Sequence, residues 1–266
     1  MLNPLLGNMV FFFIALVIIY AISKRQPNPL DGFHRDNFKA IDAFLILLAT
    51  QIIFYLLHFF LILSIKFNFT FVLNNLGFLF VLQQSFYDLV LILTFGFIIR
   101  RRRISLRSII GIRHNLVKNL IIGVSCGFIL VTGKLILVYF TGLEVFANQY
   151  TNLWIEKMSS KTSNIILWGI LIGLMGPIIE EMFFRGYLYP IFKSRLSYER
   201  ALILCALIWV LIHPLHSIAD AIVLILTGII FVFLYQRTKS IIPSLILHIC
   251  ENSFWFFATI ASFIKK

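Results

Sequence analysis

Long apolar runs most constrain what this 266-residue chain can fold into, because 60% of its residues are hydrophobic. Soluble domains have about 45–50% apolar residues, so this composition indicates a membrane protein. Most of the runs reach the roughly 20 residues that a helix needs to cross a bilayer. The sequence therefore predicts an all-α polytopic membrane bundle of about eight transmembrane helices. The runs cover residues 5–22, 41–64, 77–99, 116–140, 164–189, 200–213, 217–236 and 241–262.

The positive charge follows the expected membrane topology. The formal net charge is +12, and most Lys and Arg residues fall in every second connection between the apolar runs. The positive-inside rule places these connections in the cytoplasm. We therefore expect a multi-pass protein of the cell membrane, surrounded by the lipid bilayer, with no nucleic-acid partner. The basic connections are residues 23–40, 100–115, 190–199 and 237–240.

The ionisable residues inside the apolar runs divide the chain into two parts. Few of them lie before residue 140, and most lie after residue 160. An ionisable group inside a spanning segment costs about 2.5–3.5 kcal/mol and by default indicates a functional site. We interpret residues 1–140 as N-terminal transmembrane helices with basic cytoplasmic loops, and residues 160–262 as the catalytic transmembrane core.

The stretch GPIIEEMFFRG, residues 176–186, places three charges in the middle of an apolar run. Glu181 and Arg185 are four residues apart, so they share a face of a helix and can pair. Glu180 is left without that partner. We interpret Glu181 as structural and Glu180 as available for chemistry. The alternative is that both carboxylates belong to one ion-pair cluster that locks helices together.

Two further pairs recur at the same spacing: Trp209 with His213, and His248 with Asn252. Counted from the flanking loops, Glu180, His213, His248 and Asn252 lie at depths of roughly 12–21 Å, at 1.5 Å per residue. They could therefore meet near the membrane midplane. The alternatives are that His213 bonds a backbone carbonyl at the end of its helix, and that His248 and Asn252 form a polar clamp between helices.

These side chains suit cleavage of an amide bond by water. A buried glutamate can take a proton from water near neutral pH, and a histidine can orient that water or protonate the leaving amine. A second histidine and an asparagine amide can stabilise the oxyanion. In the first part of the chain, we interpret Asp88 as a polar packing residue that could line a cavity. We expect Lys134 to extend its ammonium group towards the outer surface.

At these residues the chain resembles the CPBP family of intramembrane proteases, which includes CAAX prenyl endopeptidases and bacteriocin-processing or immunity proteins of the Abi type. The family motif EExxxR is matched by Glu180, Glu181 and Arg185. The motif FxxxH is matched at His213, with Trp209 in place of the usual phenylalanine. The motif HxxxN is matched by His248 and Asn252. The resemblance covers roughly residues 160–260, and residues 1–115 are not constrained by it.

The resemblance implies an intramembrane glutamic endopeptidase that acts on a membrane-associated protein or peptide. It implies Glu180 as the base that activates water, with His213 assisting. It implies His248 and Asn252 as oxyanion stabilisers, with Glu181, Arg185 and Trp209 in support. We expect no cofactor, although one glutamate, two histidines and an asparagine could also hold zinc.

Two other functions remain open. A family member that does not cleave could bind a peptide or a sensor kinase in the same cavity, as an immunity or scaffold protein. A proton-coupled transporter would also bury Glu and His residues. It is disfavoured because the sequence shows no inverted repeat and its charges cluster in one half.

Overall fold

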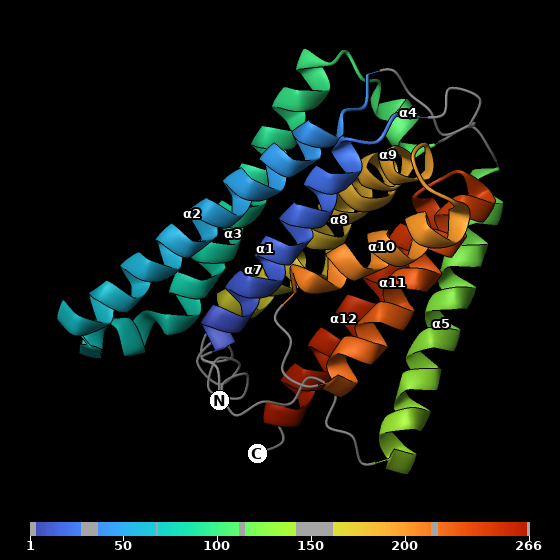
Figure 1. Cartoon of the computed structure of the whole chain (residues 1–266). Coiled ribbons are helices and arrows are strands. Elements are labelled where there is room, and N and C mark those ends of the chain that lie inside the picture. The colour runs from blue at the N-terminus through green and yellow to red at the C-terminus, as the bar shows by residue number, and fades with distance from the viewer. Residues whose placement is uncertain are drawn as a thin grey trace.

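The computed structural model describes residues 4–27, 37–67, 69–111, 115–141, 162–213 and 218–264, and these form helices and short connections without a strand. The predicted all-α bundle is confirmed (Figure 1). All eight apolar runs are helical over most of their length. The helices are α1 (Pro4–Ser23), α2 (Ala40–Phe67), α3 (Phe69–Arg101), α4 (Leu106–Ile110), α5 (Leu116–Thr141), α7 (Thr162–Ile170), α8 (Gly176–Phe183), α9 (Tyr189–Lys193), α10 (Tyr198–Leu211), α11 (Ile218–Thr238) and α12 (Ile242–Ile264).

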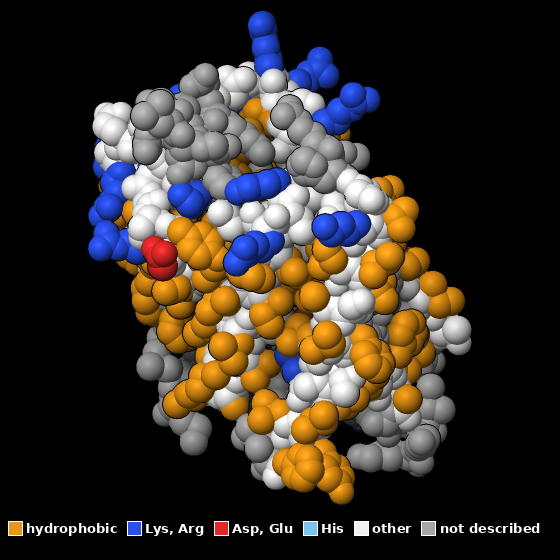
Figure 2. Space-filling model, turned by 90° about the vertical axis from the view of Figure 1, so that its right-hand side faces the viewer, with side chains coloured by type: hydrophobic (Ala, Val, Ile, Leu, Met, Phe, Trp, Pro, Cys, Tyr) orange, Lys and Arg blue, Asp and Glu red, His pale blue; other side chains and the backbone are white. Residues whose placement is uncertain are grey.

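The outer surface of the bundle is suited to lipid. Large apolar side chains of α5, such as Phe128 and Ile129, are about 70% exposed, which would be costly in water. Figure 2 shows a broad hydrophobic surface on one face, with Lys and Arg side chains gathered above it. Five helical stretches in the described residues are long and apolar enough to cross a membrane, whereas α10 has only 14 residues. The five are Ala40–Leu57, Val81–Arg101, Leu116–Leu137, Thr162–Lys193 and Ile218–Thr238.

The basic connections meet at one end of the bundle. The Nε of Arg195 donates to the carbonyl of Arg25 at 3.2 Å, which joins the third connection to the first. The backbone N–H of Ile241 donates to the carbonyl of Ile110 at 3.0 Å, which joins the fourth to the second. Helix α1 begins and α12 ends at the opposite end (Figure 1). The described parts of the basic connections therefore gather at one end of the bundle.

Two π-helical turns interrupt the long helix that carries the glutamates: η1 (Leu171–Met175) and η2 (Phe184–Leu188). Each ends two residues before a proline, Pro177 or Pro190. Proline lacks an N–H, and its ring clashes with the carbonyl four residues earlier. A turn with i→i−5 bonds relieves that clash by widening the helix, and such turns are frequent at functional sites. The two prolines thus explain why α8 is a short α-helix between two π-helical turns.

Gly186 allows the interfacial segment α4 to lie directly on η2. A Cβ at this position would be 2.4 Å from the Cγ2 of Ile109 and 2.9 Å from its carbonyl oxygen. Gly186→Ala is therefore expected to lower the free energy of unfolding by about 1–3 kcal/mol through overpacking. A thermal-unfolding measurement in detergent checks this. Gly133→Ala is the matched control, since a Cβ there meets nothing within 4 Å. Equal effects of the two changes would contradict this packing.

Candidate active site

The two adjacent glutamates of α8 lie in different surroundings. The side chain of Glu181 is fully buried, and the Nη1 of Arg185 donates to its Oε1 at 2.8 Å. The side chain of Glu180 is 23% exposed. In the part of the chain that the structure describes, no Lys or Arg pairs with Glu180. The ion pair of Glu181 with Arg185, which the four-residue spacing predicts, is present. Glu180 is the more accessible of the two carboxylates.

Glu180 forms an outer group with Trp209 and His213 of the α10 region. The indole Nε1 of Trp209 donates to Oε2 of Glu180 at 2.6 Å, and the Nε2 of His213 lies 3.7 Å from the same oxygen. The other ring nitrogen of His213, Nδ1, lies 2.6 Å from the backbone carbonyl of Trp209. A carbonyl can only accept, so Nδ1 carries a proton. The carbonyl bond expected as the alternative for His213 therefore exists, and it directs Nε2 towards Glu180.

Glu181 forms an inner group with Arg185 and His248. The Nδ1 of His248 lies 3.1 Å from Oε1 of Glu181, and both side chains are almost completely buried. The ring of His248 stacks on Phe231 with centroids 4.8 Å apart and meets the edge of Trp209 at 5.8 Å. Because the carboxylate engages Nδ1, Nε2 is the ring nitrogen that can meet a substrate. Trp209 lies between the inner and outer groups.

The guanidinium group of Arg185 is held by aromatic rings as well as by Glu181. It lies 4.7 Å from the centroid of Phe231 and 5.3 Å from that of Trp209. Cation–π attraction of this kind is strongest where water is excluded. The inner group is thus a packed unit in which charge, imidazole and aromatic faces offset one another's burial.

Asn252 packs against η1, one helical turn after His248 on α12. Its Nδ2 donates to the carbonyl of Ile172 at 3.0 Å. That carbonyl receives no N–H from its own helix, because Gly176 donates to Leu171 instead and the next residue is Pro177. An unpaired buried carbonyl costs about 1–3 kcal/mol. Asn252 therefore completes the π turn with one amide hydrogen and retains a second.

One comparison with known proteins finds a match. A family model, described as type II CAAX prenyl endopeptidase Rce1-like, matches residues 162–254. The matched span contains all three motifs, from Glu180 to Asn252. The match supports a resemblance of residues 162–254 to the CAAX protease (CPBP) family. No curated protein and no solved structure matches the chain.

The family match supports a CAAX-type membrane protease in general. The described site residues are not gathered as a metal-ligand set. Among the described residues, no three His, Cys, Asp or Glu side chains come together as a ligand set. His248 is turned to Glu181, and the Asn252 amide is turned to Ile172. A zinc site would need three or four of these donors on one point, so no step of the chemistry is assigned to a metal here.

The structure places one further acid near the outer group. Asp88 of α3 is buried and accepts a hydrogen bond from the Nε2 of Gln84 at 2.9 Å. It lies within electrostatic range of Glu180. Its Oδ2 is buried without a hydrogen-bond partner among the described residues. The signal in the sequence was a lone acid in an apolar run, which did not reveal its neighbour.

The expectation that Lys134 extends to the outer surface is wrong. Lys134 of α5 is buried and forms an ion pair with Glu251 of α12. The two residues are 117 positions apart in sequence, so helical spacing could not reveal the contact. Because the Glu251 carboxylate compensates the charge of Lys134, the ammonium group is stable inside the bundle and does not extend to the membrane surface. This pair ties α5 to α12 next to Asn252.

Proposed function

We propose that the chain is an intramembrane endopeptidase that hydrolyses a peptide bond in a membrane-associated protein or peptide. The observation that carries the proposal is the outer group, in which an accessible Glu180 without a cationic partner among the described residues faces His213. Their nearest atoms are 3.7 Å apart, a separation at which a water molecule commonly bridges two polar groups. The family match supports the same class of reaction.

The proposed reaction begins with water held between Glu180 and His213. Glu180 takes one proton as the hydroxide attacks the scissile carbonyl carbon, and the tetrahedral intermediate carries a negative oxygen. The proton then passes to the leaving amine, directly from Glu180 or through Nε2 of His213. Breakage of the C–N bond yields a carboxylic acid and an amine, and Glu180 is again a carboxylate.

We propose that the inner group stabilises the oxyanion. The Glu181 carboxylate engages Nδ1 of His248, which leaves Nε2 as the ring nitrogen that can contact the negative oxygen. The second amide hydrogen of Asn252 can join it. Glu181 and Arg185 then act by positioning His248 and not by touching the substrate. Removing one oxyanion donor typically costs about 10²–10³ in rate, so this group would contribute substantially.

We also propose that the protein spans a cell membrane with its basic connections in the cytoplasm, following the positive-inside rule. Glu180 of the outer group lies part-way along the long helical stretch that leads to the connection at 190–199. The substrate is therefore proposed to enter from within the bilayer. The geometry of the site does not require a particular substrate sequence, and it does not require a prenyl group on the substrate.

The proposed function is tested by incubating the purified protein, reconstituted in lipid vesicles, with membrane-anchored quenched peptides that do or do not carry a prenyl group. Cleavage into two fragments, identified by mass spectrometry, is the expected result. Stable binding of peptides without any fragment would instead support a binding protein of the immunity or scaffold type. That outcome would contradict the protease proposal.

Trp209→Phe is expected to slow cleavage about tenfold without unfolding the protein. Phenylalanine, the usual residue of the family motif, keeps an aromatic ring but cannot donate to Glu180, so the carboxylate loses the bond at 2.6 Å that orients it. A hydrogen bond to a charged group is worth about 1.5–3 kcal/mol. Initial rates measure the change, and a fall in kcat with unchanged KM separates loss of orientation from loss of binding. An unchanged kcat would contradict a positioning role.

A further inference from the structure

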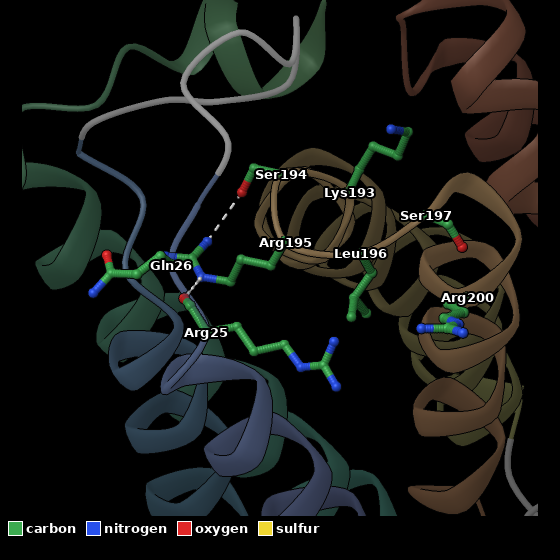
Figure 3. Close-up of a pocket in the computed structure, with 8 residues that line it drawn as sticks. All are labelled: Arg25, Gln26, Lys193, Ser194, Arg195, Leu196, Ser197 and Arg200. Carbon is green, nitrogen blue, oxygen red and sulfur yellow. Dashed lines mark hydrogen bonds between the residues drawn. The ribbon is translucent and has the colours of Figure 1, made fainter.

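A basic pocket lies outside the active site, at the end of the bundle where the basic connections meet. Its volume is about 260 Å³. It forms where the end of α1, the connection between α9 and α10, and the first turn of α10 come together (Figure 3). The residues used in the argument below are Arg25, Lys193, Ser194, Arg195, Ser197 and Arg200.

The lining of this pocket is strongly cationic. Arg25, Lys193, Arg195 and Arg200 contribute to it, and none of the described residues that line it is acidic. Figure 3 shows Arg25, just past the end of α1, and Arg200 of α10 on either side of the space between them. Like charges around one hollow repel each other, and the repulsion is relieved when an anion occupies the hollow. Three of the four cations are arginines, whose planar donors suit phosphate oxygens.

Part of the pocket is held in place by hydrogen bonds. The Nη1 of Arg195 donates to the carbonyl of Ile191 and to the Oγ of buried Ser194, both at 3.0 Å, and its Nε donates to the carbonyl of Arg25. The side chain is therefore ordered before any ligand arrives, which lowers the entropic cost of binding. Ser197, the residue before the 14-residue helix α10, makes no capping hydrogen bond with its side chain. Its hydroxyl and the first N–H groups of α10 add donors on the same side.

The same helices that form the pocket expose apolar side chains nearby. Val17 and Tyr20 of α1 are about half exposed, and so is Ile203 of α10. Tyr20 lies five residues before Arg25, and Ile203 lies three residues after Arg200. A ligand with a phosphate at the pocket and alkyl chains along these side chains would match both chemistries.

We propose that this pocket binds the phosphate of an anionic membrane lipid, whose acyl chains lie along the exposed apolar side of α1 and α10. The shared chemistry of the site is phosphate recognition by arginines. A free phosphate ion could supply the same group, but it would leave the apolar surface unused. Bound lipid would also link α1 to the segment that connects α9 and α10, next to the protease core.

The experiment measures lipid retained by the full-length protein in detergent, using phosphatidylglycerol, phosphatidylcholine and inorganic phosphate as separate probes. Phosphatidylglycerol is expected to bind and raise the unfolding temperature, whereas phosphatidylcholine has little effect. Arg25→Gln and Arg200→Gln are each expected to weaken phosphatidylglycerol binding about fivefold, the value of one cation near a charged lipid surface. Both are exposed side chains, so the fold is expected to persist.

Arg107→Gln is the matched control, because Arg107 is an exposed cation near the same end of the bundle but does not line the pocket. It is expected to change binding less than twofold. Equal losses in all three variants would show a diffuse charge effect and overturn the pocket. Full occupancy and stabilisation by inorganic phosphate alone would overturn the assignment to a lipid.

Discussion

Glu180→Gln is expected to abolish peptide cleavage while the protein stays folded. Glutamine can still accept the indole hydrogen bond of Trp209, but it cannot take a proton from water. General-base catalysis contributes about 10²–10⁴ in rate, so a loss of at least a hundredfold is expected. Because Glu180 is partly exposed and has no cationic partner among the described residues, its neutralisation leaves no buried charge behind. Initial rates and thermal unfolding are measured on the same preparation.

Glu180→Asp is the matched variant, since it keeps the carboxylate and moves it back by one methylene group. It is expected to retain a measurable fraction of the rate, well above that of Glu180→Gln. The assignment of Glu180 as the base would be contradicted if Glu180→Gln cleaved within tenfold of the wild type. It would also be contradicted if the two variants were equally inactive and equally unstable.

Arg185→Met is expected to destabilise the folded protein. Arg185 and Glu181 are both fully buried and hydrogen-bonded at 2.8 Å. Removing one partner of a buried pair leaves an uncompensated charge and typically costs about 3–5 kcal/mol, whereas replacing both partners is often much less costly. A large fall in unfolding temperature is therefore expected for Arg185→Met and for Glu181→Gln.

The double variant, Glu181→Gln with Arg185→Met, distinguishes a buried pair from two separate contributions. It is expected to be more stable than the sum of the single changes predicts, because neither charge is left alone. His248 also bonds Glu181, so activity should stay low even where stability returns. Additive losses of stability would contradict the pairing as the reason for the burial of these residues.

Contacts within one helical stretch could be predicted from the sequence because the helix period is regular. The spacing of four residues correctly predicted that Glu181 meets Arg185 and that Trp209 and His213 share a face. It also indicated that Glu180 would lack a cationic partner. The apolar runs correctly predicted where the helices lie, because length and hydrophobicity are sufficient to identify a membrane-spanning helix.

Contacts that depend on local register or on pairs of helices could not be predicted in this way. The π turn before Pro177 exposes the carbonyl to which Asn252 donates. Regular α-helical spacing contains no such turn. Glu251, the partner of Lys134, and Glu180, the acidic neighbour of Asp88, lie on other helices, and only packing brings them together. The division into an outer and an inner group follows from these details of packing.

The most direct test of the central claim compares the purified wild type with Glu180→Gln on a quenched-peptide library, with and without a metal chelator. The account predicts that the wild type cleaves peptides at the same rate in both conditions and that Glu180→Gln, although folded, cleaves none. Loss of wild-type cleavage on adding the chelator, with recovery when zinc is returned, would contradict the claim that Glu180 and His213 activate water without a metal.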